Sequence, residues 1–342
     1  MSSMKKCLVW DLDNTIWDGV FLEGRVRVKS DVVTTIVELD RRGILHSIAS
    51  RGDEDLAMKN LKYNNLEEFF LVPQINWLPK SQNIITISKK LELSLDAMAF
   101  VDDDRFEREQ VAFMLPEVLT IESEKAQELP GRSEFSPGLI TQEARERRRI
   151  YQTELDRQKS ERSFRSRDDF LKSCKMKMTI RQMTESDIPR VLELMTRTHQ
   201  LNTTGLIFDE QELHKIFRSA KRATRILVAD LEDKFGWYGT IGTAMIETQQ
   251  PSWRLKYLAV SCRVMGRGIE RAFLASMVRN AVAGGFENLE AEFHETGRNK
   301  MMRALYQMMG FRAHDAPNES GPLIFRATIE DVPKSPRWIE VL

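Results

Sequence analysis

The sequence predicts an α/β protein of two domains, an N-terminal Rossmann-like parallel sheet followed by a C-terminal mixed α/β domain. In the first half, short apolar runs alternate with amphipathic segments, the pattern of parallel strands joined by helices. In the second half, neighbouring apolar runs joined by a short turn indicate antiparallel strands, and a glycine-rich turn leads into a helix. A chain of 342 residues is also longer than one typical domain.

The composition gives the chain no bias toward nucleic acid or membranes. The 51 basic residues balance the 51 acidic ones, so no net charge favours nucleic acid or anionic lipid. The sequence has no apolar run of about 18 residues and no signal-peptide pattern at its start. Three scattered cysteines, Cys7, Cys174 and Cys262, predict reduced thiols rather than disulfides or a cysteine zinc site. We therefore expect a cytoplasmic protein.

Two carboxylates follow the first predicted strand. The apolar run Cys7 to Trp10 predicts a short buried strand, and Asp11, Asp13 and Thr15 follow it in one loop. Ligands of an open α/β sheet bind beyond the carboxyl ends of its strands, where this pair stands. One carboxylate can attack phosphorus while the other handles protons, and both can hold Mg²⁺. A solvated turn after a buried strand is the alternative.

Alternating strands and helices follow the acid loop. Residues 17–27, with two glycines, predict a turn or hairpin that provides only a small local cover. The other predictions for this half are buried strands at residues 44–49, 69–72 and 97–101 and amphipathic helices at residues 31–42 and 81–91.

Three of these elements carry further polar candidates. Ser50 follows the second strand, where a hydroxyl can bind phosphate or cap a helix. Lys80 precedes a helix, a position where a nearby anion would stabilise a cation; a solvated surface lysine is the alternative. The acids Asp102 to Asp104 end the fourth strand, where a divalent cation would offset their repulsion; a charged surface turn is the alternative.

These four strand ends resemble the motifs of the haloacid dehalogenase superfamily of Mg²⁺-dependent phosphotransferases. The likeness covers roughly residues 5 to 120. It implies a Rossmann-like parallel sheet with a minimal cap, Asp11 as the nucleophile and Asp13 as the general acid/base. It also implies that Ser50, Lys80 and Thr15 bind the transferring phosphoryl group and that Asp11, Asp13, Asp102 and Asp103 hold Mg²⁺.

The C-terminal half predicts a second set of strands around a glycine-rich turn. Predicted strands cover residues 178–182, 225–229, 240–246 and 257–262, and a helix follows the first of them. Residues 235–239 are predicted as a turn. Residues 263–268, R-V-M-G-R-G, lead into a helix that ends near residue 282. The free N–H groups of such a turn suit an anion.

This turn resembles the pyrophosphate loop R-x-x-G-x-G of the GCN5-related N-acetyltransferases. The likeness covers about residues 176 to 330 and includes, further along, Asn299, Ala304, Leu305, Tyr306, Gly310 and Phe311. The resemblance implies a mixed α/β acetyltransferase-like domain. It implies that phosphopantetheine is bound by Arg263, Gly266, Arg267 and Gly268.

Longer phrases are similar to the FkbH-like proteins of polyketide biosynthesis, over almost the whole chain. The phrases are D-L-D-N-T-I-W-D-G-V, I-N-W-L-P-K-S-Q-N-I, F-V-D-D-D-R-F-E-R-E and V-S-C-R-V-M-G-R-G-I-E. Members of that family are glyceryl transferase/phosphatases. The resemblance implies that 1,3-bisphosphoglycerate loses phosphate and that a glyceryl unit passes to the thiol of a phosphopantetheinylated acyl carrier protein, with Mg²⁺ as cofactor.

The chain departs from that family at the second motif, which is commonly I-C-S-K-N and here is I-A-S-R-G, residues 48–52. Ala49 supplies no thiol, so Cys262 beside the glycine turn is the candidate for transient thioester formation; an inert buried thiol is the alternative. His294 and Glu295 are candidates for a base or for substrate contacts, with a polar loop pair as the alternative.

The predicted domain plan has four parts. They are a haloacid dehalogenase-like domain at 1–140, a charged helical linker at 141–175, an acetyltransferase-like domain at 176–330 and a C-terminal tail at 331–342. The predicted function is Mg²⁺-dependent glyceryl loading of an acyl carrier protein. The alternatives are a phosphatase of another small phosphorylated metabolite and a catalytically silent scaffold that docks carrier proteins. The intact acids Asp11, Asp13 and Asp102 argue against the scaffold.

Overall fold

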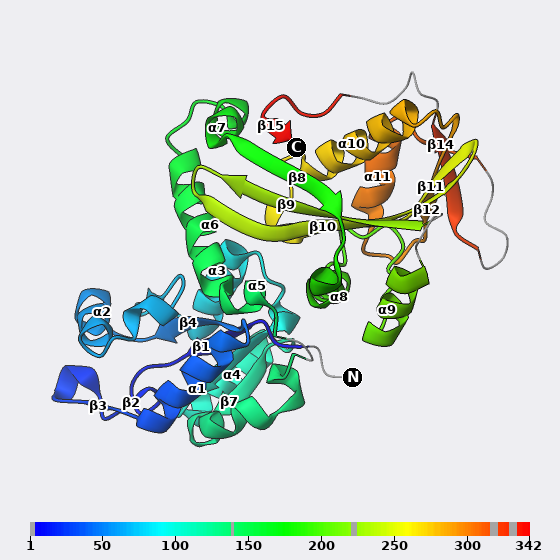
Figure 1. Cartoon of the computed structure of the whole chain (residues 1–342). Coiled ribbons are helices and arrows are strands. Elements are labelled where there is room, and N and C mark those ends of the chain that lie inside the picture. The colour runs from blue at the N-terminus through cyan, green and yellow to red at the C-terminus, as the bar shows by residue number, and fades with distance from the viewer. Residues whose placement is uncertain (1–3, 138–139, 220–223, 315–320, 328–333) are drawn as a thin grey trace. The chain divides into compact units, whose positions relative to one another are not determined.

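The computed structural model describes residues 4–137, 140–219, 224–314, 321–327 and 334–342 (Figure 1). The chain divides into two compact units, Met1–Gln158 and Lys159–Leu342, each with its own sheet and core. The division falls inside helix α6 (Arg147–Glu161), within the segment predicted to link two domains. None of the helices formed by these residues combines the length and the apolar character that crossing a membrane requires.

The N-terminal unit is built on a five-stranded, fully parallel sheet of order β5-β4-β1-β6-β7. Its strands are β1 (Cys7–Trp10), β4 (Leu45–Ser50), β5 (Gln74–Ile75), β6 (Met98–Asp102) and β7 (Leu119–Glu122). Its main helices are α1 (Ser30–Arg41), α2 (Glu54–Tyr63), α3 (Lys80–Leu91) and α4 (Arg105–Met114). This arrangement confirms the predicted Rossmann-like class.

Helices cover both faces of this sheet, which explains the continuous apolar runs in its strands. Side chains alternate along a strand, so Leu8 and Trp10 of β1 pack into the core formed with α1 and α2. Cys7 and Val9 point to the opposite face and pack with α3 and α4. The strand order also reverses at β1, because the chain passes from β1 to β4 on one side and later to β6 on the other. Such a switch point forms a crevice at the carboxyl ends of the strands.

The third strand lies later in the chain than predicted. Residues 69–72 make only an isolated bridge, between Phe70 and His46, and β5 instead occupies Gln74–Ile75 in the predicted loop. Val72 has a φ of 55°, a left-handed conformation that an extended strand cannot contain. Pro73 then supplies no N–H for a ladder. The paired stretch therefore begins only after Pro73.

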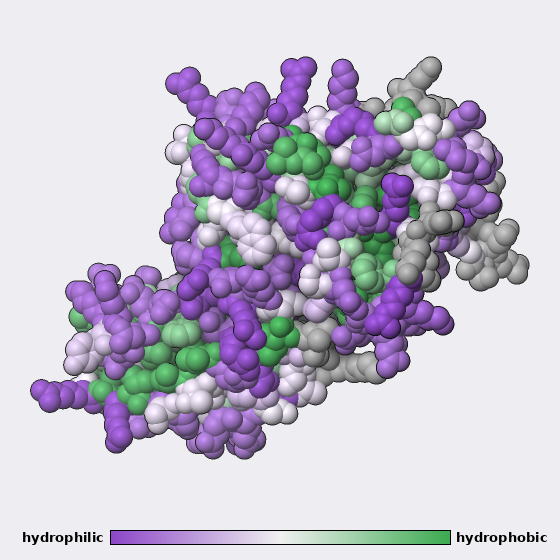
Figure 2. All heavy atoms as spheres, in the orientation of Figure 1, coloured by the Kyte–Doolittle hydropathy of each residue, from purple (hydrophilic) through white to green (hydrophobic). Residues whose placement is uncertain are grey.

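A short hairpin forms the local cover next to the first strand. It pairs β2 (Trp17–Asp18) with β3 (Arg27–Val28) in an antiparallel ladder, with a 3-10 turn at Phe21–Glu23 between them. This is the small cover that residues 17–27 predict. Figure 2 shows apolar surface on the N-terminal unit in the region between α2 and this hairpin.

The charged segment 141–175 forms three helices, and parts of it pack into the two cores instead of standing in solvent. α5 (Gln142–Arg145) buries Ala144 against the N-terminal unit, and Arg147 donates a hydrogen bond of 3.1 Å to the carbonyl of Gly43. α7 (Arg167–Cys174) contributes Phe170, Leu171 and Cys174 to the C-terminal core. These buried residues recur at helical spacing, a short pattern that the many charges hide.

The C-terminal unit contains an eight-stranded mixed sheet of order β13-β14-β12-β11-β10-β9-β8-β15. Its strands are β8 (Met176–Gln182), β9 (Thr224–Asp233), β10 (Gly236–Gln249), β11 (Ser252–Val260), β12 (Asn288–Phe293), β13 (Arg312–Ala313), β14 (Leu323–Ala327) and β15 (Ile339–Val341). One face packs against α10 (Ile269–Ala283) and α11 (Lys300–Met308), and the other against α8 (Ile188–Arg197) and α9 (Glu210–Ser219). This mixed α/β architecture agrees with the predicted class.

Two details of this unit differ from the sequence expectations. Residues 339–341, assigned to a tail, form β15, which pairs in parallel with β8 and places Ile339 in the core. An apolar Ile-x-Val segment of this length gives little signal by itself. The turn expected at residues 235–239 is shorter, because β10 already begins at Gly236 and carries a register shift between Trp237 and Gly239.

Gly43→Ala is expected to lower the free energy of unfolding of the N-terminal unit by about 1–3 kcal/mol. Gly43 has a φ of +74°, and a Cβ atom there would lie 2.7 Å from the carbonyl oxygen of Ala144. Chemical denaturation of the full chain measures the effect. Gly24→Ala is the control, because Gly24 is extended, with a φ of 161°, and its Cβ position has no atom within 4 Å. Equal effects of the two changes would show that α5 does not press on Gly43.

Candidate active site

A buried lysine joins two buried carboxylates at the carboxyl end of the N-terminal sheet. Asp11 follows β1, Asp102 is the last residue of β6, and Lys80 is the first residue of α3. The Lys80 Nζ atom lies 2.7 Å from Asp11 Oδ1 and 2.5 Å from Asp102 Oδ2. All three side chains are at most 6% exposed. The parallel register of β1 and β6 places both acids at one edge, as the strand-end pattern predicts.

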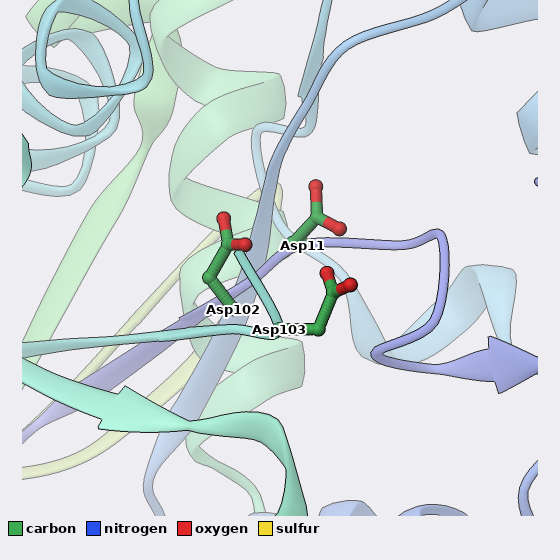
Figure 3. A group of neighbouring side chains, drawn as sticks. All are labelled: Asp11, Asp102 and Asp103. Atoms are coloured by element: carbon green, nitrogen blue, oxygen red, sulfur yellow. The ribbon is translucent and has the colours of Figure 1, made fainter. Parts of the chain in front are cut away.

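Asp103 adds a third carboxylate to this group (Figure 3). Asp11, Asp102 and Asp103 each place a carboxylate oxygen within 4.8 Å of the others. One ammonium group faces three carboxylates, so the ionised cluster has an excess of two negative charges. Carboxylate oxygens are the ligands that Mg²⁺ uses in proteins, and this charge matches a divalent cation. The residues therefore fit the predicted metal.

Burial sets the protonation of these groups. It raises the pKa of Asp11, an effect that Lys80 and a hydrogen bond from Ser50 partly offset. Burial, together with the neighbouring charge of Asp11, raises the pKa of Asp102 to about 7. Burial also acts to lower the pKa of Lys80, but Asp11 and Asp102 outweigh it and the pKa is raised. The lysine stays charged, while Asp102 exchanges its proton near neutral pH.

The loop after β6 gives each of its three acids a different role. Asp102 Oδ1 accepts a hydrogen bond of 2.8 Å from the backbone N–H of Asp104, and the Asp104 carboxylate caps α4 through the N–H of Phe106. Thr15 accepts from the backbone N–H of Asp103 at 3.1 Å and donates to Asp103 Oδ1 at 3.4 Å. The Thr15 hydroxyl, predicted to bind phosphate, thus orients the exposed acid of the cluster.

The Asp13 carboxylate is not a member of the acid cluster, although it was predicted to be a metal ligand. Its Oδ1 atom accepts hydrogen bonds from the indole of Trp17 at 2.7 Å and from the backbone N–H of Phe21 at 3.0 Å. In the loop after β1 it therefore faces the small cover, whereas Asp11 faces Lys80. The D-x-D spacing alone does not separate these two directions. Asp13 remains a candidate for the general acid/base, and its carboxylate is hydrogen-bonded to the cover.

Ser50 lies at the same edge, as its position after the second strand predicts. It is the last residue of β4, is 2% exposed, and its side chain forms a hydrogen bond with Asp11. Five residues thus meet where three strands of the sheet end: Asp11 after β1, Ser50 of β4, Asp102 and Asp103 at the end of β6, and Lys80 at the start of α3. This group can bind a phosphoryl group, neutralise its charge and present a carboxylate to it.

Two polar contacts around the site were not predicted. Arg51, directly after Ser50, forms an ion pair of 2.8 Å with Glu107 of α4. Arg108 of the same helix donates to the carbonyls of Asp102 and Asp103, at 3.0 and 2.7 Å. The sequence gives no signal for either contact. Arg51 and Glu107 lie far apart in the chain, and the partners of Arg108 are backbone carbonyls.

Exposed apolar side chains occur in the loops and helix starts that carry the motifs. Trp77 and Leu78 precede Lys80, and Phe106 follows the acid loop; they are 68%, 53% and 65% exposed. Leu56 at the start of α2 and Leu22 in the cover are exposed as well. Exposed apolar groups around a polar site are typical of an interaction surface.

The predicted phosphopantetheine loop has the backbone of a glycine turn, and it contacts distant parts of its own unit. Gly266 and Gly268 have φ values of 75° and 81°. The Trp338 indole donates a hydrogen bond of 2.9 Å to the carbonyl of Arg267, whose own Nη1 atom donates to the hydroxyl of Tyr238 at 2.5 Å.

Further contacts bring both ends of the unit to this turn. Arg167 of α7 donates a hydrogen bond of 3.0 Å to the carbonyl of Gly266, and a Cβ atom on Gly268 would lie 3.0 Å from Pro336. Arg263 donates to the carbonyl of Tyr238. The loop is therefore held by side chains that the motif does not include.

Another internal contact bridges β11 and β12 beyond the point where they pair. Their ladder ends at Leu255 and Ala291. Farther along, the segment 201–203 is bonded to both strands: Val260 donates to the carbonyl of Leu201, and His294 to that of Thr203, at 2.9 and 3.0 Å. The fully buried Asn299 amide donates to the carbonyls of Asn202, Thr203 and His294.

The remaining candidates lie in the C-terminal unit. Cys262 begins the short 3-10 turn Cys262–Val264 directly after β11, with its thiol only partly buried. The residue is thus less buried than the alternative of a buried thiol implies. His294 and Glu295 follow β12 and have exposed side chains. The backbone N–H of His294 donates a hydrogen bond to the carbonyl of Thr203.

No protein-family model matches the chain, and no curated protein sequence matches it. Among solved structures, it is similar to the N-terminal part of BF1531 from Bacteroides fragilis, which contains a phosphatase domain complexed with Mg. The identity is 31% over 35% of this chain and 36% of that one, with a TM-score of 0.33. The chain thus spans about a third of that structure.

Acetyltransferase structures are similar over a different share of the chain. The ribosomal-protein-S18-alanine N-acetyltransferase of Escherichia coli is 21% identical over 44% of this chain and 94% of its own, with a TM-score of 0.34. The ribosomal-protein-alanine N-acetyltransferase of Brucella melitensis is 22% identical over 44% and 98%, with a TM-score of 0.35. Each of these likenesses covers less than half of the chain.

Mg²⁺ is expected to raise the midpoint of thermal unfolding at pH 8 and to have little effect at pH 5. The pKa of Asp102 is raised to about 7 by burial and by Asp11, so at pH 5 a proton occupies the oxygen that the metal needs. Without metal, this raised pKa makes the acid a destabilising group whose cost appears as pH rises from about 4 to 7. Bound Mg²⁺ removes that cost.

Differential scanning calorimetry with and without Mg²⁺ at the two pH values checks this expectation. Asp102→Asn should abolish the response to Mg²⁺ at pH 8. A shift of the same size at both pH values would contradict the assignment of the metal to these carboxylates.

Proposed function

We propose that the N-terminal unit is a Mg²⁺-dependent phosphatase or phosphotransferase of the haloacid dehalogenase type and that Asp11 is its nucleophile. The observation that carries this proposal is the buried Lys80 bridging Asp11 and Asp102 beside Asp103. A lysine and a cation site at one strand edge supply the charge neutralisation that phosphoryl transfer requires. The hydrogen bond of Ser50 to Asp11 supports a role for this hydroxyl in binding a phosphoryl oxygen.

The reaction divides into two steps on this chain's own residues. A carboxylate oxygen of Asp11 bonds to phosphorus while the bond from phosphorus to the leaving oxygen breaks, and Asp13 gives that oxygen a proton. A water molecule then attacks the aspartyl phosphate, Asp13 takes its proton, and phosphate and the Asp11 carboxylate are regenerated. Mg²⁺ held by Asp11, Asp102 and Asp103 would neutralise phosphoryl charge when bound.

The finer proposal is that the enzyme loads a glyceryl unit from 1,3-bisphosphoglycerate onto a phosphopantetheinylated acyl carrier protein in the cytoplasm. In the acyl step a thiol sulfur bonds to the acyl carbon, the bond from that carbon to the C1 phosphate oxygen breaks, inorganic phosphate leaves, and the thiol proton passes to solvent. If Cys262 is acylated first, the carrier thiol then bonds to the same carbon while the bond to the Cys262 sulfur breaks and that sulfur regains a proton. The Asp11 reaction removes the C3 phosphate, which leaves a glyceryl unit. The phrases shared with the FkbH-like proteins support this assignment. Cys262 beside the glycine turn is the candidate first thiol, and Arg263, Gly266, Arg267 and Gly268 are the candidate phosphopantetheine contacts.

The exposed apolar side chains around the N-terminal site also support a substrate borne by a protein. A free three-carbon phosphate ester needs no apolar rim, whereas a carrier protein docking over the site would cover it. The thioester chemistry also suits reduced thiols, which the three cysteines of the chain indicate.

A phosphatase of another small metabolite, with the C-terminal unit recognising a partner, is a second candidate. The observation that favours it is the set of contacts around the glycine turn. Trp338 and Arg167 both bond to the carbonyls of that turn, and Pro336 packs against Gly268. A ligand at this loop would have to share it with these groups.

Asp11→Asn is expected to lower Mg²⁺-dependent phosphate release by at least about 10³-fold, because an amide cannot attack phosphorus. Release of inorganic phosphate from acetyl phosphate and from 1,3-bisphosphoglycerate measures the effect. Cys262→Ala serves as the control, because this thiol takes no part in the phosphoryl step and release should persist. Unchanged phosphate release by the Asp11→Asn variant would refute the assignment of Asp11 as the nucleophile.

The holo carrier protein is expected to gain the mass of a glyceryl unit when it is incubated with the enzyme, 1,3-bisphosphoglycerate and Mg²⁺. Intact-protein mass spectrometry measures this gain, and Cys262→Ala should abolish it while leaving the Asp11-dependent release of phosphate from acetyl phosphate intact. Phosphate release without any mass gain would favour the second candidate. Carrier binding with neither phosphate release nor mass gain would favour a silent scaffold.

A further inference from the structure

We propose that Arg51 determines specificity at the Asp11 site by binding a second anionic group of the substrate, a carboxylate or a phosphate, and that the buried Glu107 positions it. The substrate class is thus a phosphate ester or acyl phosphate with a second anion a few bonds from the reacting phosphorus. This inference rests on the phosphoryl chemistry proposed for Asp11, and it assigns a role to the residues that replace the family's usual Lys-Asn.

The ion pair joins the two loops that flank the nucleophile. Arg51 directly follows Ser50, whose side chain bonds to Asp11, and neighbouring Cα atoms are about 3.8 Å apart. Glu107 belongs to the first turn of α4, which begins right after the acid loop of β6. Because β4 and β6 lie on opposite sides of β1, the contact between Arg51 and Glu107 connects the loops on both sides of Asp11.

Glu107 holds Arg51 from a buried position. The Glu107 side chain is only 7% exposed, and Arg51 Nη2 lies 2.8 Å from its Oε1 atom. The second oxygen, Oε2, is buried and has no hydrogen-bond partner in the part of the chain that the structure describes. A buried carboxylate is costly unless it is paired, so Arg51 is the group that compensates it. The turn itself is fixed by the bonds of Arg108 to Asp102 and Asp103.

Arg51 keeps donors for a ligand. Its side chain is 47% exposed, and a guanidinium has five N–H donors, whereas the ion pair with Glu107 is formed by Nη2. Lys80, in contrast, is enclosed between Asp11 and Asp102. Gly52 leaves room beside the arginine, since the atom nearest to a Cβ there is 3.8 Å away. A planar fork of donors of this kind suits a carboxylate or a phosphate.

A purely structural ion pair between the loops is the competing explanation. It predicts that removal of Arg51 disturbs every ligand of the site to the same degree. A specificity-determining arginine predicts a loss confined to ligands with the second anion. Probes that differ only in that charge separate the two.

The experiment measures binding to the full chain by isothermal titration calorimetry with Mg²⁺ at pH 7.5. The probes are phosphonoacetate and 3-phosphonopropionate, each compared with its neutral amide. These phosphonates are not hydrolysed, so the measurement is independent of turnover. The variants are Arg51→Gln, Arg51→Lys and Glu107→Gln. Arg41→Gln is the matched control, because Arg41 is 50% exposed and paired with Glu38, on a helix that ends at the opposite edge of the sheet.

The unchanged protein should bind at least one acid about ten-fold or more tightly than its amide. Arg51→Gln should abolish this preference and leave the amide affinity within about two-fold, while Arg51→Lys should keep part of it. Glu107→Gln should reduce the preference, and Arg41→Gln should not change it.

Equal weakening of acid and amide by Arg51→Gln, or no preference in the unchanged protein, would overturn the proposal. If Arg51→Gln fails to fold, the comparison of acid and amide with Arg51→Lys decides: an undiminished preference overturns the bidentate role. Failure of the proposed function is a different result, namely that Asp11→Asn leaves phosphate release unchanged.

Discussion

The N-terminal unit depends on one buried interaction, the ammonium group of Lys80 between the carboxylates of Asp11 and Asp102. Isolated buried charges are among the most costly groups in a protein, and each of these three is tolerable only with the others in place. The parallel sheet provides the geometry, because it places the ends of β1 and β6 side by side and α3 begins at the same edge. The remaining polar contacts of the site, from Ser50, Thr15 and the N–H of Asp104, then orient the carboxylates around this lysine. The site holds an excess of negative charge, which a divalent cation can neutralise.

The C-terminal unit shows how a mixed α/β fold can be tied together by its own chain. Where β11 and β12 diverge, residues 201–203 bond to both, and Asn299 fixes that segment from α11. The glycine turn is likewise in contact with Arg167 near the start of the unit and Trp338 near its end. The contacts at the glycine turn use its carbonyl groups, whereas the N–H groups of such a turn are the ones that suit an anion.

Charge placement also separates the roles within the N-terminal site. Lys80 is enclosed and neutralises the acids, whereas Arg51 is half exposed and is supported from behind by Glu107. Asp13 bonds to the cover through Trp17 and Phe21, so this carboxylate and the cover form one unit. In the pair of Arg51 and Glu107, the buried carboxylate holds a guanidinium that lies at the surface. Burial fixes the position of Glu107, and exposure leaves Arg51 accessible to a substrate.

Sequence patterns were enough to predict the two fold classes, the buried strands with their acids and the four residues that meet Asp11, namely Ser50, Lys80, Asp102 and Asp103. These features depend on local patterns, since an apolar run fixes a strand and the ends of parallel strands share an edge. The sequence did not determine the direction of Asp13, the pairing of Arg51 with Glu107, or the contacts of Trp338 and residues 201–203. The strand predicted at 69–72 failed, because Val72 adopts a left-handed φ. The packing of the helical segment 141–175 was not foreseen either, since α5 buries Ala144 and α7 adds apolar residues to the C-terminal core. These points can be seen only in the folded chain, because each depends on partners that are remote in the sequence or on backbone atoms that carry no sequence signal.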